Sequence, residues 1–166
     1  MILRLVREQD AEALIAANHT NRAYHAPWVT PPTDRDAFDA WFACLAQGRH
    51  ASMIALSDDN AIIGVINFNE IVMGNFRSCY LGYYGMVDCA GQGLMTQALR
   101  TALVHAHDEL SLHRFEANIQ PANYRSIALV KRLGFCLEGF SPSYLFIDGA
   151  WRDHERWAIL LDGTIP

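Results

Sequence analysis

The spacing of apolar residues along the chain predicts first a strand and then two helices. Residues 1–7 alternate as a strand does, and a helix that Asp10 caps is expected to reach Asn18. Thr33 and Asp36 have the spacing of a capping box, which predicts the start of a second helix. The apolar face of this second helix consists of Phe38, Trp41, Phe42 and Leu45.

The order of the later elements defines the fold class. The expected further strands are 51–56, 61–68, 78–87, 115–120, 144–147 and 151–161. Apolar residues recur at helical spacing from Leu94 to Leu110, and a shorter helix is expected from Asn123 to Leu133. Asp148-Gly149 is a hairpin signal between the last two strands. This order predicts an α/β (α+β) fold, with helices packed on a mixed sheet of about seven strands.

Composition indicates one packed core and argues against nucleic-acid-binding and membrane-spanning proteins. With 166 residues, 51% hydrophobic and 19% charged, the chain is expected to form a single domain over residues 1–166. The net charge of −5 gives no overall basic surplus for binding nucleic-acid phosphates. No apolar run approaches the length of a membrane-spanning helix, and the charged N-terminus is unlike a signal peptide. Neither a nucleic acid nor a membrane is therefore expected as a partner.

The cysteines and histidines form no disulfide or metal-binding pattern. Cys44, Cys79, Cys89 and Cys136 are far apart and include no CxxC pair, so we expect reduced thiols in a cytoplasmic protein. The histidines lack the spacing that is typical of metal ligands, and no metal is expected.

The most informative segment leads from the expected strand 78–87 into the long helix. It contains Gly91-Gln92-Gly93, directly before the helix begins. A helix N-terminus leaves amide N–H groups unpaired, and glycines let a phosphate approach the backbone. The segment is not a P-loop, because no Gly-Lys-Ser/Thr follows, and Thr96 stands where a dinucleotide fingerprint has its third glycine. By itself this pattern fits a phosphate-binding turn and a simple strand-to-helix turn equally well.

A second segment, 113–126, places polar residues at the start of the next helix. Asn123 can cap this helix, and Ser126 lies one turn further along. The two positions fit a purely structural cap as well as a ligand-binding helix end. On the strand before the glycines, Tyr83 and Tyr84 fit core packing, with a place along a substrate channel as the alternative.

Several motifs follow one another in a fixed order along the chain. They are Gly91-Gln92-Gly93-Leu94-Met95 with Ala98-Leu99, His113-Arg114, Asn123-x-x-Ser126, Leu133-Gly134-Phe135 with Glu138-Gly139, Tyr144-Leu145 and Ile147-Asp148-Gly149-x-Trp151-Arg152-Asp153-His154. In this order they resemble the GNAT superfamily of acyl-CoA N-acyltransferases, and most closely its RimJ/RimL branch of ribosomal-protein N-terminal acetyltransferases. The resemblance covers most of the chain and is densest from about Ile62 to Leu160.

The resemblance implies a GNAT-type sheet that splays open between its fourth and fifth strands to admit acetyl-CoA, the co-substrate. On the family pattern Q/R-x-x-G-x-G/A, the turn that holds the pyrophosphate maps onto Ala90 to Met95. Ala90 departs from the family's Gln or Arg, which removes a supporting side chain and keeps the backbone amides. The coenzyme-binding residues implied in this way are Val87, Gly91, Gln92, Gly93, Leu94, Met95, Asn123 and Ser126.

The resemblance also implies a role for three of these residues in the reaction. The Val87 backbone and Asn123 would hold the pantetheine arm from its two sides. Ser126 is the expected catalytic residue, a general acid that donates to the departing CoA thiolate as charge develops on the sulfur.

The sequence does not single out one general base. The positions at which related enzymes carry a glutamate hold Asn118 and Leu145 here, and neither can accept a proton. Glu70, Glu116 and a chain of water molecules are the remaining candidates, since an α-amine is partly neutral near pH 7.7.

The implied reaction is direct acetyl transfer from acetyl-CoA to a primary amine in a ternary complex, without an acyl-enzyme. The favoured acceptor is the N-terminal α-amine of a protein, such as a ribosomal protein. A small amine (an antibiotic, toxin or polyamine) is the first alternative. A non-catalytic acyl-CoA-binding module is the second, because Ala90 and the missing glutamates depart from the family.

For a homodimer, the closing hairpin and the helix from Thr33 are the expected contacts.

Overall fold

Seven strands form one sheet in the computed structural model, which describes residues 1–162. They are β1 (Ile2–Leu5), β2 (Ala51–Leu56), β3 (Ile62–Val72), β4 (Ser78–Gly85), β5 (Arg114–Ile119), β6 (Cys136–Ile147) and β7 (Ala150–Leu160). Their order across the sheet is β1-β2-β3-β4-β5-β7-β6. Every neighbouring pair is antiparallel except β4 and β5, which are parallel. The predicted mixed sheet is thereby confirmed.

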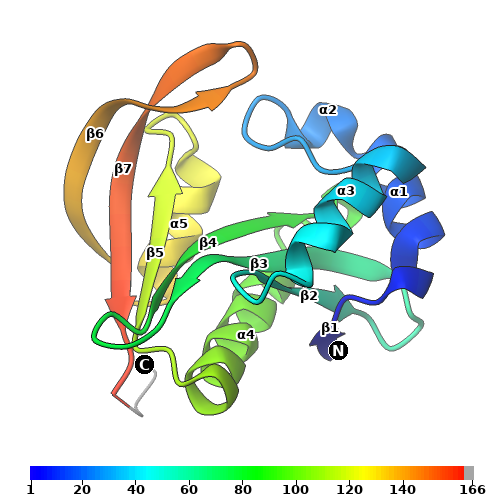
Figure 1. Cartoon of the computed structure of the whole chain (residues 1–166). Coiled ribbons are helices and arrows are strands. Elements are labelled where there is room, and N and C mark those ends of the chain that lie inside the picture. Colours follow the sequence, from blue (N-terminus) through cyan, green and yellow to red (C-terminus); the bar gives the residue numbers. More distant parts are fainter. Residues whose placement is uncertain (163–166) are drawn as a thin grey trace.

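Helices cover both faces of this sheet (Figure 1). They are α1 (Ala11–Thr20), α2 (Arg22–His25), α3 (Arg35–Leu45), α4 (Leu94–Leu110) and α5 (Tyr124–Arg132), with short 3-10 turns at Glu8–Asp10 and Val87–Cys89. Apolar residues of α1 and α3 form one core with one face of the sheet, and those of α4 and α5 form a second core with the other face. The central strands are apolar on both faces because both faces are buried.

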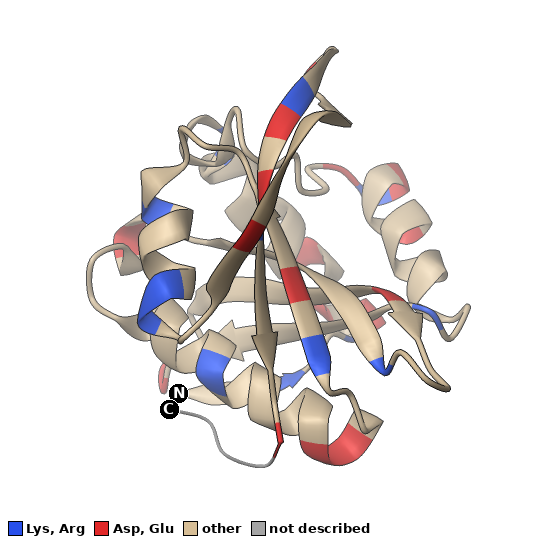
Figure 2. Ribbon diagram, turned by 90° about the vertical axis from the view of Figure 1, so that its left-hand side faces the viewer, with Lys and Arg blue, Asp and Glu red and all other residues tan. Residues whose placement is uncertain are grey.

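The β6–β7 hairpin closes the sheet and projects beyond the other strands (Figures 1 and 2). The sequence pattern predicts its first strand only from residue 144, whereas β6 begins at Cys136. Its pairing with β7 shifts register between Leu137 and Gly139 and again between Ser141 and Leu145. These irregularities break the alternation from which a strand is recognised in sequence.

The sheet opens between β4 and β5, as expected. Their ladder covers only Ser78–Tyr80 on β4, paired with Arg114–Glu116 on β5. Beyond Tyr80, β4 continues to pair with β3 on its other side, while β5 diverges toward β7 (Figure 1). The remaining residues of β4, 81–85, have no partner on the β5 side.

Two glycines bring the first turn of α4 close to the splayed part of the sheet. A Cβ on Gly64 of β3 would lie 2.5 Å from Met95 Sδ and 2.5 Å from the Tyr84 carbonyl oxygen. A Cβ on Gly85 of β4 would lie 2.8 Å from Met95 Cγ. Because side chains are absent at both positions, Met95 can pack directly against the two strands, and the glycine-rich turn lies beside the end of β4.

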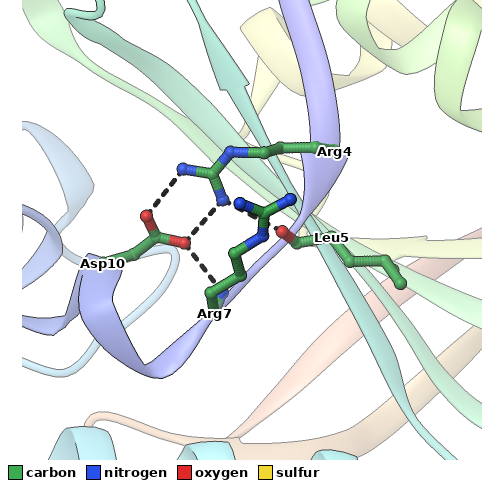
Figure 3. Close-up of polar contacts among 4 residues, drawn as sticks. All are labelled: Arg4, Leu5, Arg7 and Asp10. Carbon is green, nitrogen blue, oxygen red and sulfur yellow. Dashed lines mark hydrogen bonds and ion pairs between the residues drawn. The ribbon is translucent and has the colours of Figure 1, made fainter.

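Two predicted helix caps are wrong in detail. Asp10 precedes α1, but its side chain makes no capping hydrogen bond and instead binds the guanidinium of Arg4 and the N–H of Arg7 (Figure 3). Asp34 rather than Thr33 caps α3, by accepting a hydrogen bond of 2.8 Å from the Ala37 N–H. In the first case the predicted residue accepts hydrogen bonds from other donors, and in the second the neighbouring residue makes the capping bond.

The strand predicted over 78–87 is also shorter, because β4 ends at Gly85 and a 3-10 turn begins at Val87. The helix predicted from Leu94 to Leu110 has the predicted bounds. None of the helices within residues 1–162 has both the length and the apolar character needed to cross a membrane.

Candidate active site

A cleft of about 930 Å³ lies where β4 diverges from β5. Four parts of the chain form its walls: α2 with the loop after it, the end of β4, the glycine-rich turn with the first turns of α4, and α5. The cleft is thus built from segments far apart in the sequence, which the splay of the sheet brings together.

The glycine-rich turn presents open backbone at one end of the cleft. Gly91 and Gly93 both have left-handed φ values, +75° and +76°, and an added Cβ at either would meet no atom within 4 Å. Gly93 is the N-cap of α4, where the amides of the first turn lack a carbonyl partner in the helix. Positive φ favours glycine, and exposed amides at the positive end of a helix favour an anion. This geometry fits a phosphate group.

Five of the predicted coenzyme residues line the cleft, and Ala90 lines it with them. The five are Gly91, Gly93, Met95, Asn123 and Ser126. Gln92, by contrast, turns its side chain back, so that its Nε2 donates to the Asp88 carbonyl at 2.7 Å. Leu94 packs against the core beneath α4. Gln92 and Leu94 therefore shape the turn and do not line the cleft.

Val87 is placed differently from the expectation. Its N–H donates to Asn21 Oδ1 at 2.7 Å, and its carbonyl accepts a hydrogen bond of 3.0 Å from the Ala90 N–H. Both backbone groups therefore bind other parts of the protein, and Val87 does not line the cleft. Gly85 and Met86, where β4 ends, line the cleft instead.

Asn123 and Ser126 help to form the start of α5 and also line the cleft. Asn123 caps α5, because its Oδ1 accepts a hydrogen bond of 3.2 Å from the Ser126 N–H. Both residues line the cleft as well. The structural interpretation of the sequence is therefore correct, and it leaves the Ser126 hydroxyl available for other contacts.

The Ser126 hydroxyl contacts a tyrosine from the opposite wall. Tyr83 of β4 places its phenol oxygen 2.6 Å from Ser126 Oγ. Burial raises the pKa of the Tyr83 phenol well above its ordinary value of 10. The two residues are 43 positions apart, and no local spacing in the sequence connects them.

The charged side chains that line the cleft are basic, although the chain is acidic overall. Arg100, Arg125 and Arg132 line the cleft, and no Asp or Glu does so within the described residues. Arg132 Nη1 donates to Thr96 Oγ1 at 3.0 Å, beside the first turn of α4. Figure 2 shows basic positions along α5 and in α4, whereas the acidic positions of α4 lie at its C-terminal end. The local charge therefore suits an anionic ligand.

Comparison with known proteins decides the family. The family model described as "Acetyltransferase (GNAT) domain" matches residues 1–136. The chain belongs to the GNAT acetyltransferase family. The expected enzyme class, an acetyl-CoA-dependent N-acetyltransferase, is thereby confirmed.

The relatives of this GNAT acetyltransferase include ribosomal-protein acetyltransferases. It is 37% identical to the [ribosomal protein uS5]-alanine N-acetyltransferase of Escherichia coli (strain K12), over all of this chain and 90% of the relative. The structure of RimJ from Mycobacterium smegmatis in complex with CoA-disulfide matches with a TM-score of 0.85 and 31% identity, over 96% of this chain and 81% of that one. The ribosomal-protein-S5-alanine acetyltransferase of Vibrio fischeri also matches with a TM-score of 0.85, at 26% identity, over 99% and 94%.

In this GNAT acetyltransferase, the two carboxylates considered as general base lie away from the cleft. Glu70 forms an ion pair with Arg49, and Glu116 forms one with Arg114 at 2.7 Å. Neither glutamate is among the residues that line the cleft. Each is committed to a structural ion pair instead.

His25 is a cleft-lining residue that the sequence pattern did not reveal. Its Nε2 lies 3.0 Å from the Gly85 carbonyl, which requires the tautomer with a proton on Nε2. Its Nδ1 is buried and has no hydrogen-bond partner within residues 1–162. Burial lowers the pKa of His25 below 6.5, so its ring is neutral at pH 7. A lone histidine in a helical segment carries no motif, so only its contact with β4 identifies it.

Metal-binding clusters are absent from the part of the chain that the structure describes. No group of three or more His, Cys, Asp or Glu residues there has suitable geometry. All four cysteines are free thiols.

Proposed function

We propose that this acetyltransferase moves the acetyl group of acetyl-CoA to the N-terminal α-amine of a protein, with a ribosomal protein as the natural acceptor. The observation that supports the acceptor best is the similarity to the uS5-alanine N-acetyltransferase, which extends over the whole chain. The basic cleft with its exposed glycine turn supports the use of acetyl-CoA as the donor. The free cysteines are in keeping with action in the reducing cytoplasm.

The residues of the glycine-rich turn would hold the coenzyme by its phosphates. The amides that follow Gly91 and Gly93 suit the pyrophosphate, and Arg100 and Arg132 add positive charge nearby. Asn123 would contact the pantetheine arm from the α5 side. Gln92, Leu94 and Val87 support this site indirectly, through the internal contacts that fix the turn.

The reaction itself needs an amine nucleophile, a leaving thiolate and a donor for that thiolate. The amine nitrogen attacks the acetyl carbonyl carbon, and the carbon–sulfur bond then breaks, with its electron pair going to the sulfur. We assign Ser126 as the general acid at the sulfur, since its hydroxyl lines the cleft on α5. The nitrogen loses one proton overall and the thiol gains one, so the reaction consumes no other reagent.

Removal of the amine proton would use water rather than a carboxylate. The cleft has no acidic lining residue within the described chain. An α-amine has a pKa of about 7.7–8.0, so a useful fraction is neutral at physiological pH. An N-terminal α-amine is therefore a better acceptor for this cleft than a lysine side chain, whose pKa of about 10.4 would demand a stronger base.

The test has a binding stage and a turnover stage. The purified protein is first titrated calorimetrically with acetyl-CoA and with CoA, and micromolar binding of both is expected. Peptides with N-terminal Ala or Ser are then compared with spermidine and other small amines by release of free CoA thiol. Faster acetylation of the peptides supports the proposal, and faster acetylation of the small amines contradicts it. Binding without turnover of any amine would indicate a non-catalytic acyl-CoA-binding module.

A further inference from the structure

The contact between Tyr83 and Ser126 bridges the two walls of the cleft. Tyr83 lies on the part of β4 that has lost β5 as a neighbour, and it pairs with Ile66 of β3 on the other side. Ser126 lies in the first turn of α5, where its N–H is bound by Asn123. The 2.6 Å contact therefore joins two hydroxyls whose backbones are each held by a separate element.

The surroundings of the pair determine which hydroxyl donates. Within residues 1–162, Ser126 Oγ is the one hydrogen-bond partner of the Tyr83 phenol. If Ser126 donated to Tyr83, the buried phenol proton would have no acceptor, which is unfavourable for a buried donor. If Tyr83 donates, its proton is satisfied and the serine O–H is left to point elsewhere. The second arrangement satisfies both groups once the cleft holds an acceptor for the serine proton.

We propose that Tyr83 is a positioning residue for acetyl transfer: its phenol donates to Ser126 Oγ and thereby directs the serine hydroxyl toward the leaving sulfur of coenzyme A. This inference rests on the proposed function, because it needs a thiolate to leave near Ser126. A hydroxyl that already accepts one strong hydrogen bond is also a better donor in its turn. Tyr83 thus acts on the sulfur only through Ser126.

The phenol does not itself lose its proton in this scheme. Burial raises the pKa of Tyr83 far above that of a thiol, so Tyr83 stays neutral throughout. Ser126 gives its proton to the sulfur and recovers one from the water that receives the amine proton. Protons therefore balance between the amine nitrogen and the thiol, with Tyr83 as a fixed donor.

The experiment is a double-mutant cycle on the single-turnover rate. Enzyme in excess over acetyl-CoA is mixed with a peptide bearing an N-terminal alanine, for the wild type, Tyr83→Phe, Ser126→Ala and the double variant. Tyr83→Phe is expected to slow acetyl transfer about tenfold or more, with the Kd for CoA and the KM for acetyl-CoA little changed. In the Ser126→Ala background, the same Tyr83→Phe change should have no further effect.

A matched control separates loss of the contact from loss of a tyrosine hydroxyl as such. Tyr80→Phe removes the same group from the same strand, at a half-exposed position outside the cleft. It should leave the transfer rate unchanged, and the melting temperatures of both Phe variants should confirm that each is folded.

Each possible result decides between the two proposals. Equal rates for Tyr83→Phe and the wild type would overturn the positioning role and leave the proposed function intact. Multiplicative effects in the double variant would show that Tyr83 acts independently of Ser126, which also overturns it. If the wild type acetylates neither peptides nor amines, the proposed function fails and this inference fails with it.

Discussion

Two polar regions of the molecule differ in how completely their polar groups are hydrogen-bonded within the protein. At the N-terminal corner, Asp10 accepts two hydrogen bonds of 2.7 Å from Arg4 and one of 2.7 Å from the Arg7 N–H (Figure 3). At the splay of the sheet, by contrast, His25 Nδ1 and Asn118 Oδ1 are buried without a hydrogen-bond partner in the described chain. The polar groups around Asp10 are therefore hydrogen-bonded to one another (the closed region), whereas buried polar atoms at the splay lack a partner (the open region).

The difference indicates where the protein is built for stability and where it is built for a ligand. Asp10 is buried and charged, and its neighbours neutralise that charge, which lowers the pKa of its carboxyl. Unbound polar atoms such as His25 Nδ1 cost free energy, so they persist most readily where a ligand supplies the missing partner. Four variants test this contrast.

Gly93→Glu should have the largest effect, because it places a negative charge in the cleft where the coenzyme phosphates are proposed to bind. The new carboxylate would lie at the anion-binding end of α4, and we expect coenzyme affinity to fall at least about 100-fold. Calorimetric titration with CoA measures this loss. Gly48→Glu is the matched control, since Gly48 has a similar φ of +74° and open surroundings outside the cleft. If both variants bind CoA like the wild type, the turn does not hold the phosphates.

Ser126→Ala should have the next largest effect and should separate binding from chemistry. Without the hydroxyl, the leaving sulfur lacks its donor, and we expect turnover to fall about 100-fold. The Kd for CoA should stay within a few-fold of the wild type, as measured by calorimetry. Unchanged turnover under single-turnover conditions would rule out Ser126 as the general acid.

Asp10→Ala tests the closed corner through stability. It leaves Arg4 partly buried without its partner, which should lower the free energy of unfolding by about 2–3 kcal/mol. Denaturant unfolding measures the change, and CoA affinity should not move. Asp58→Ala is the control, because Asp58 forms an exposed ion pair with the N-terminus, and such pairs contribute little. Equal losses in the two variants would contradict the special role of the Asp10 corner.

The smallest expected effect is a difference in pH dependence between the two regions. The pKa of His25 is lowered in the folded state, so the unfolded chain binds its proton more readily. The stability associated with a neutral His25 is therefore complete above pH 6.5 and is lost as the pH falls below it. His25→Leu should flatten the fall in stability between pH 6.5 and 5, as followed by thermal unfolding. A slope unchanged from the wild type would show that other groups carry this dependence.

Asp10 should also lose its stabilising effect as the pH falls, but at a lower pH than His25. Its pKa is lowered below 3.8 in the folded state, so the stabilisation is complete above that value and disappears as the pH falls through the folded-state pKa. Asp10→Ala should therefore differ from the wild type in the mildly acidic range and converge with it in strong acid. Convergence already near pH 5 would contradict this assignment.

Local sequence patterns determined most of the elements of this protein and the most local part of its site. The period of apolar residues predicted α4 with the bounds that the structure has, and the strand 51–56 likewise. The glycines before α4 and the polar residues at the start of α5 predicted the two helix ends that line the cleft. These features follow from backbone conformation and hydrogen bonding within a few residues, which the sequence encodes directly.

Tertiary structure decided which of these groups meet. Asp10 has the sequence of a helix cap, but the proximity of β1 gives it Arg4 as a stronger partner. Tyr83 reaches Ser126 only because β4 separates from β5 and α5 packs beside the gap. His25 becomes a cleft residue through a bond to Gly85, 60 positions away. Such contacts depend on strand order and on where pairing stops, and neither is a property of any short stretch of sequence.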